Sequence, residues 1–140
     1  MTDPPLSPTP RPVASRRQNL LRLVFATVWI LNGLFAKVLL LVPRHAEIVA
    51  RILGSDHALL LTRLIGLGEI LLAAWILSGW SPRACAALQI ALIMAMNVIE
   101  QFLAPDLLLF GRWNLLWATA LAACIAWNEW TEPPRQETRP

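Results

Sequence analysis

The sequence predicts an all-α protein: a four-helix transmembrane bundle with a short amphipathic helix between the first and second spans. Of the 140 residues, 56% are hydrophobic and only 15% are charged, whereas soluble domains are about 25% charged. Four apolar runs of about 20 residues follow one another, each long enough to cross a ~30 Å hydrocarbon core. The remaining segments are too short to fold alone, which excludes a soluble enzyme domain and a receptor with a folded head.

Prolines mark the ends of the four runs, because proline lacks a backbone N–H and disfavours continuing a helix. Very short connections make consecutive helices antiparallel neighbours. Residues 1–18, which carry five prolines, predict a disordered cytoplasmic tail, and residues 131–140 predict a second one. The predicted spans are 19–42, 58–80, 83–104 and 106–130.

The connector 43–57 predicts a short amphipathic helix at the outer membrane interface. Ile48, Val49 and Ile52 fall on one face of this helix. Glu47 and Arg51 lie on another face, where they form a favourable pair at i and i+4. A membrane-surface connector is favoured over a functional lid.

The distribution of lysine and arginine predicts the orientation. Of the basic residues near the span ends, two lie in the long connector, Arg44 and Arg51, and seven lie on the other side: Arg11, Arg16, Arg17, Arg22, Arg83, Arg135 and Arg139. Both termini are therefore predicted to lie in the cytoplasm, in a bacterial-type cytoplasmic (inner) membrane. The net charge of +3 has this topological explanation. The basic residues are scattered, with no aromatic-interleaved patch for nucleic acid.

Ionisable and amide side chains inside membrane spans are costly, so each is a candidate for function or pairing. Once helix direction is considered, every span places such residues in its outer half. The inner halves are almost purely apolar, with Gln89 as the main exception. The candidate ligand-binding residues are Asn32, Lys37, Arg63, Glu69, Asn97, Glu100, Arg112 and Asn114.

Glu69 is the strongest candidate of this set. It lies about 15 Å from the outer end of its helix, near the midplane. Its short side chain must be neutral, paired with a basic residue, or face a wet cavity. At 100° per residue, Arg63 and Glu69 are about 120° apart, and Arg112 and Asn114 about 200° apart, so some of these side chains face elsewhere. A ligand site and interhelical packing remain nearly equal alternatives.

Metal and haem ligation have little support. His45 and His57 sit on the connector with Glu47 but without a ligand spacing, so surface histidines are favoured. No pair of histidines occupies the spans, and no catalytic residue can be named.

Small residues within the spans are expected to serve packing. Cys85 and Cys124 form no CxxC motif, which disfavours thiol–disulfide chemistry and favours two small buried side chains. Gly33, Gly66 and Gly68 predict close contacts between helices.

Three segments carry a resemblance to a known family: WILNGLFAKVLLLVPRHAEIVARILG, LTRLIGLGEILLAAWILSG and MNVIEQFLAPDLLLFGRWN. Together they resemble the DoxX-like family of small four-helix membrane proteins, over about residues 25 to 117. The resemblance implies a four-span fold. Relatives in this group include DoxD-type subunits of a quinone-reducing thiosulfate oxidation system and MauE-type maturation proteins.

These observations predict a membrane accessory subunit of a redox system that holds a quinone-like amphiphile in an outer-leaflet polar cavity. Its expected partners are the bilayer and a redox enzyme or another membrane subunit. The alternative is a non-enzymatic structural or assembly protein whose intramembrane charges serve helix packing and partner binding. A proton pathway is disfavoured because the polar residues stop at mid-depth. Catalysis is disfavoured as well, since the sequence offers no nucleophile, metal set or cofactor motif.

Overall fold

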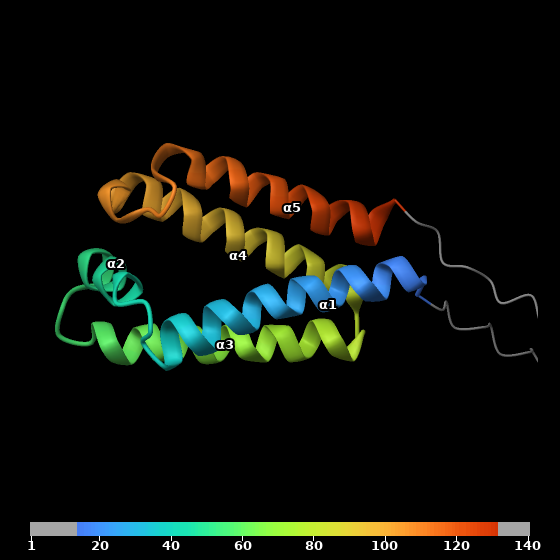
Figure 1. The fold of residues 1–140 in the computed structure, drawn as a ribbon, viewed down its shortest axis with the longest axis horizontal. Coiled ribbons are helices and arrows are strands. Elements are labelled where there is room, and N and C mark those ends of the chain that lie inside the picture. The colour runs from blue at the N-terminus through green and yellow to red at the C-terminus, as the bar shows by residue number, and fades with distance from the viewer. Residues whose placement is uncertain (1–13, 132–140) are drawn as a thin grey trace, which may run out of the picture.

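The computed structural model describes residues 14–131, and this part of the chain is helical without strands. Four long helical segments run side by side, and the short helix α2 lies at one end, opposite the two ends of the described chain (Figure 1). This end is called the α2 end below. In chain order the elements are α1 (Arg16–Ile30), η1 (Leu31–Val38), α2 (Arg44–Leu53), α3 (Ala58–Ser78), α4 (Pro82–Leu103), η2 (Pro105–Leu107), η3 (Gly111–Trp113) and α5 (Asn114–Trp130).

Three segments are long and apolar enough to cross a membrane: Arg16–Val38, Ala58–Ser78 and Pro82–Leu103. Their outer surfaces carry large exposed apolar side chains, such as Leu71 and Phe102, which are 71% and 80% exposed. An apolar surface of this kind is suited to lipid and not to water.

The predicted fourth span, 106–130, begins later than expected. Two short 3-10 turns, η2 and η3, occupy its first part, and the helix α5 starts at Asn114. Gly111 has a left-handed φ of 50°, which an uninterrupted helix cannot contain. The 17 residues of α5 extend about 25 Å, less than a ~30 Å hydrocarbon core. A fourth membrane crossing therefore stays a prediction.

The first helix begins at Arg16, three residues before the predicted start. Ser15 forms a capping box with Gln18: the serine hydroxyl accepts from the Gln18 backbone N–H, and the Gln18 side chain accepts from the Ser15 N–H. This box satisfies two N–H groups that the helix itself leaves unpaired. Most of the predicted N-terminal tail and nearly all of the C-terminal one, residues 1–13 and 132–140, lie outside the described residues.

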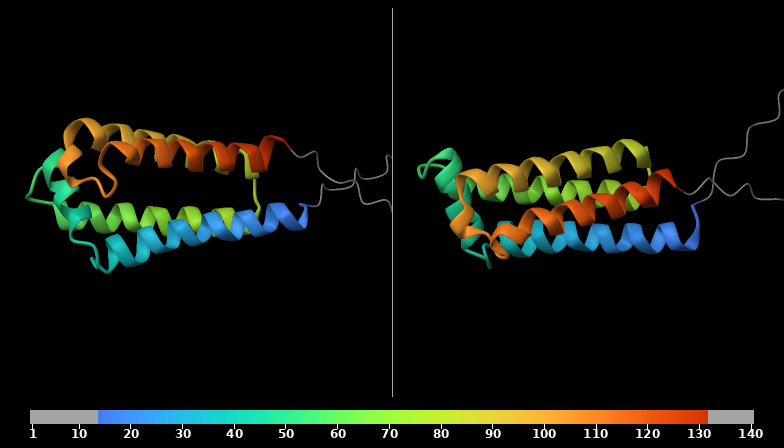
Figure 2. Two further views of the ribbon diagram at one scale, coloured as in Figure 1. Left: turned by 45° about the horizontal axis from the view of Figure 1, so that its top comes forward. Right: turned by 90° about the horizontal axis from the view of Figure 1, so that it is seen from above.

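The bundle consists of two closely packed pairs of helices. One pair is α1 and η1 with α3, and the other is α4 with α5, as the left view in Figure 2 shows. The core between them contains Trp29, Leu72, Ile76, Ile93 and Ile125. Contacts between the pairs are sparser than contacts within them.

Two glycines explain the close approach of η1 and α3. A Cβ atom on Gly33 would lie 2.6 Å from the backbone oxygen of Gly66, and a Cβ on Gly66 would lie 2.6 Å from the oxygen of Gly33. The prediction of close contacts is therefore confirmed at these two positions. It is wrong at Gly68, where an added Cβ would meet nothing within 4 Å.

The predicted amphipathic connector is confirmed as α2, which follows a turn at Leu40 with φ of 54°. Ile48 and Val49 are buried against the bundle. Arg51 does not form the expected pair with Glu47 but an ion pair with Asp106, which links α2 to η2. Both side chains of that pair are largely exposed, so it contributes little stability.

Replacing Gly33 by alanine is expected to destabilise the bundle. The added Cβ must push the backbone of α3 away, which costs about 1 to 3 kcal/mol, as overpacking typically does. Thermal unfolding of the purified protein in mild detergent measures this loss. Gly68→Ala is the matched control, since it adds the same methyl group to open space and leaves the unfolding temperature unchanged or slightly raised. Equal unfolding temperatures for the two variants would contradict the close contact.

Candidate functional site

A cavity of about 820 Å³ lies between the two helix pairs at the α2 end. Its wall is mostly apolar and comes from α1, η1, α2, α3, α4, the η2–η3 segment and the first residue of α5. Six of the eight candidate residues line it: Asn32, Lys37, Glu69, Asn97, Glu100 and Asn114. The other two, Arg63 and Arg112, are exposed and lie outside its lining. This placement agrees with the helical geometry, in which Arg63 lies about 120° from Glu69 and Arg112 about 200° from Asn114.

A buried ion pair between Lys37 and Glu69 forms one wall of the cavity. The two residues are only 3% and 4% exposed, and the lysine Nζ donates to Glu69 Oε1. Asn32 Nδ2 donates to the same oxygen at 3.4 Å. Of the three states expected for Glu69, the structure shows pairing with a basic residue, and the close approach of Gly33 to the α3 backbone brings Lys37 beside it.

Several polar atoms at the cavity have no hydrogen-bond partner among residues 14–131. They are Glu69 Oε2, Arg44 Nε and His45 Nδ1, all of them buried. The half-buried Glu100 also lines the cavity, and within the same part of the chain no hydrogen bond to its carboxylate is found. Buried polar atoms are normally paired with protein, water or a ligand. These residues therefore bring unused hydrogen-bonding groups to the cavity wall.

Two amides link the helices of the second pair at the cavity wall. Asn114 Nδ2 donates to Asn97 Oδ1 at 2.7 Å, and Asn97 Nδ2 donates to the backbone oxygen of Ile93 at 2.8 Å. Asn114 is the first residue of α5, so this bond fixes where α5 starts against α4. Both amides contribute to positioning the wall as well as to its polarity.

Arg44 and His45 are cavity residues that the sequence did not identify. His45 was expected on the surface, yet it is half-buried and lines the cavity from the first turn of α2. Burial and the nearby positive charges of Lys37 and Arg44 lower the pKa of His45 from 6.5 to about 4. Their position in the sequence could have indicated this, because both residues directly follow Pro43, where the chain turns back onto the bundle.

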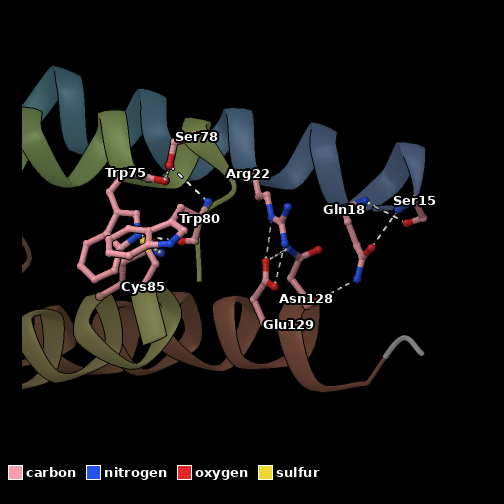
Figure 3. A network of polar contacts seen from close by, with 10 residues as sticks. Ser15, Gln18, Arg22, Trp75, Ser78, Trp80, Cys85, Asn128 and Glu129 are labelled. Atoms are coloured by element: carbon pink, nitrogen blue, oxygen red, sulfur yellow. Dashed lines mark hydrogen bonds and ion pairs between the residues drawn. The ribbon is translucent and has the colours of Figure 1, made fainter. Parts of the chain in front are cut away.

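A second polar network lies at the opposite end of the bundle (Figure 3). Arg22 donates two hydrogen bonds of 2.9 Å to the carboxylate of Glu129, and Gln18 Nε2 donates to the backbone oxygen of Asn128 at 3.3 Å. The expectation of almost purely apolar inner halves is therefore wrong for this end. These bonds connect the start of α1 to the end of α5.

The buried Gln89 belongs to a smaller set of contacts between the two ends. Its Oε1 accepts from Trp29 Nε1 at 3.2 Å, and its Nε2 lies 3.7 Å from the sulfur of Cys85. Cys85 is buried as expected, whereas Cys124 is exposed, so the prediction for Cys124 is wrong. Of these residues, Trp29 lines the cavity, whereas Gln89 and Cys85 do not.

A family model described as the DoxX-like family matches residues 26–127. The chain belongs to the DoxX-like family. Three apolar helices of spanning length, together with this membership, make this DoxX-like protein a membrane protein. The matched residues include every polar side chain that lines the cavity. No curated protein and no solved structure matches the DoxX-like chain.

The lowered pKa of His45 predicts a pH-dependent stability for this DoxX-like protein. Between pH 6.5 and 4 the unfolded chain binds a proton that the folded chain does not, so stability is lost as the pH falls through this range. At pH 5 we expect His45 to account for a loss of about 1 to 2 kcal/mol. Glu69 and Glu100 also line this cavity, so the contribution of His45 is isolated by substitution.

The measurement compares unfolding temperatures at pH 7.5 and pH 5 in the wild type, His45→Gln and His57→Gln. His57 is exposed on the same connector and serves as the control. His45→Gln should reduce the loss on acidification, and His57→Gln should not. An identical loss in all three proteins would show that His45 titrates normally.

Proposed function

We propose that this DoxX-like protein binds the polar head of a quinone-like amphiphile in its cavity, as an accessory subunit of a membrane redox system. The observation that carries the proposal is the set of unpartnered atoms around the cavity: Glu69 Oε2, Arg44 Nε and His45 Nδ1. Leaving such atoms buried and unpaired costs about 1 to 3 kcal/mol each. A ligand that pairs with them recovers this free energy.

The size and composition of the cavity support a small molecule. Its volume of about 820 Å³ falls within the range of about 300 to 1,000 Å³ that is usual for ligand pockets. Apolar side chains such as Trp29, Met96 and Phe110 make up most of the wall. The few polar groups converge from different helices, which is the arrangement that orients a polar head.

The charges around the cavity favour a head without net charge. Lys37 and Arg44 bring two positive charges, and Glu69 and Glu100 bring two negative ones, while the lowered pKa of His45 keeps it neutral at pH 7. A ligand with net charge would leave one of these charges uncompensated in a poorly solvated site. A quinone or quinol head is neutral and offers oxygen acceptors to the donors and, when reduced, hydroxyl donors to the carboxylates.

The redox part of the proposal rests on the family resemblance. The cavity residues bind and orient the ligand, and a partner enzyme supplies or removes the electrons.

In this proposal the α2 end faces the outer side of a bacterial-type cytoplasmic membrane and both termini are cytoplasmic. The support for that orientation is the excess of arginines near the opposite end.

Replacing Glu100 by glutamine tests the binding site without disturbing a known contact. The variant keeps the size of the side chain and loses a charged acceptor, so ligand retention should fall about tenfold, as expected for a hydrogen bond to a charged group. Small molecules extracted from protein purified in mild detergent are quantified by mass spectrometry. Glu47→Gln makes the same chemical change on the exposed face of α2 and is the control.

The wild type and the Glu47→Gln variant should retain the same amphiphile in stoichiometric amount, with equal unfolding temperatures in all three proteins. An empty wild-type protein, or equal retention by Glu100→Gln, would refute the proposed binding site.

The second candidate is a structural or assembly role, which the ion pair between Lys37 and Glu69 favours. A buried pair with this geometry holds η1 against α3 whether or not a ligand binds. Polar contacts of this kind help helices associate in lipid, where apolar surfaces gain little from meeting one another.

A pair of variants separates packing from binding. Glu69→Gln leaves Lys37 buried without its counter-charge and should cost about 3 to 5 kcal/mol of stability. In Lys37→Met/Glu69→Gln both charges are removed, and the unfolding temperature should recover most of this loss. Ligand retention should stay low in the double variant, because the Glu69 carboxylate is still absent. Wild-type retention together with restored stability would assign the pair to packing alone.

A further inference from the structure

An apolar groove of about 400 Å³ lies along the seam between α3 and α4. It shares three lining residues with the cavity, Trp29, Glu69 and Met96, so the two spaces lie on either side of these side chains. Apart from these three, its wall consists of apolar residues and one glycine: Ile65, Gly68, Leu71, Leu72, Trp75, Leu88 and Leu92. Several of these leucines are also exposed on the outer surface of the bundle, so the groove opens toward lipid.

Gly68 is the residue that packing within the bundle does not explain. A glycine in a helix interior costs about 1 kcal/mol relative to alanine. At Gly33 and Gly66 the close contact of two backbones accounts for this cost, but at Gly68 an added Cβ would meet nothing within 4 Å. The missing side chain leaves the groove open one residue before Glu69.

We propose that this groove holds the apolar chain of the amphiphile whose polar head occupies the cavity. The inference rests on the proposed function. Its position beside the cavity supports it, and so does Glu69, which lines both spaces, has a side chain that is 95% buried (5% exposed) and keeps one oxygen unpartnered. The head lies on the polar side of Glu69, and the chain runs over Gly68 toward the bilayer.

A second groove, between α1 and α5, suits a hydrocarbon chain less well. Its volume is about 230 Å³. Three asparagines line it, Asn32, Asn97 and Asn114, so a larger part of its wall is polar. The groove at α3 and α4 has a single polar residue, Glu69, which also lines the cavity.

Filling the groove at Gly68 tests this inference. Gly68→Leu places a bulky apolar side chain where no atom of the described protein stands in the way of its Cβ. Two probes with the same head are compared: decylubiquinone, which carries a ten-carbon chain, and 2,3-dimethoxy-5,6-dimethylbenzoquinone, which carries none. Dissociation constants come from quenching of tryptophan fluorescence in nanodiscs of one fixed lipid composition. The dissociation constant of each probe is compared between variants in the same lipid, so the partition of the probe into lipid does not affect the ratio.

We expect Gly68→Leu to weaken decylubiquinone binding about tenfold, within the range that steric misfit in an apolar pocket produces, and to leave binding of the chainless quinone unchanged. Ala74→Leu is the control, because Ala74 is exposed on the same helix and lines none of these spaces. Its affinities for both probes should equal those of the wild type. The unfolding temperature of Gly68→Leu should match or exceed that of the wild type, since leucine is a better helix former than glycine, and that of Ala74→Leu should stay close to that of the wild type.

The outcomes separate the two proposals. If the wild type binds both probes and Gly68→Leu binds both equally well, the chain lies elsewhere and the groove assignment is wrong, while the cavity proposal stands. If Gly68→Leu weakens both probes by the same factor, the groove assignment is again wrong, because the substitution then acts on the head. If the wild type binds neither probe, the quinone-like head is refuted and the groove assignment falls with it.

Discussion

The buried ion pair between Lys37 and Glu69 constrains the rest of this bundle. Two charges can remain at this depth only if they compensate each other, because separating them in a medium of low dielectric constant costs several kcal/mol. Compensation requires that η1 and α3 approach within side-chain reach, and the facing backbones of Gly33 and Gly66 allow this approach. The glycine contact and the ion pair therefore depend on each other. The π-helical turns of η1 carry both Gly33 and Lys37, which places this irregular segment at the centre of the arrangement.

The two helix pairs are held together differently at their two ends. At the end opposite α2, Arg22 and Glu129 connect α1 to α5 by two hydrogen bonds of 2.9 Å. At the α2 end the side chains of Lys37 and Glu69 are occupied within one pair, and those of Asn97 and Asn114 within the other. Few polar contacts remain to join the pairs there, and α2 covers the space that results. The cavity thus follows from where the polar contacts are made.

For the polar residues at the α2 end, the sequence predicted their location in the bundle better than it predicted which side chains they contact. Four apolar runs and the direction of each helix were enough to place the candidate polar residues at one end of an all-helical bundle. Angular separation indicated that some of them face elsewhere, and the structure shows that these are Arg63 and Arg112. Composition could not show that Lys37 pairs with Glu69, because that depends on how closely two backbones approach. The apolar residues after Pro105 predicted a helix from residue 106. Gly111, however, adopts a left-handed φ, and α5 begins only at Asn114.

Contacts between helices in lipid explain why open grooves lie along the seams between the pairs. Lipid chains are as apolar as leucine, so helices gain little by burying leucine against leucine and associate where backbones fit closely or polar groups pair. In this bundle such sites are Gly33 with Gly66, the Lys37–Glu69 and Arg22–Glu129 pairs, and the asparagines Asn97 and Asn114. Along the seam of α3 and α4 a hydrocarbon chain competes with a helix for the same surface on nearly equal terms. An amphiphile anchored by its head at Glu69 has the advantage there, since its chain reaches the seam without a further loss of translational freedom.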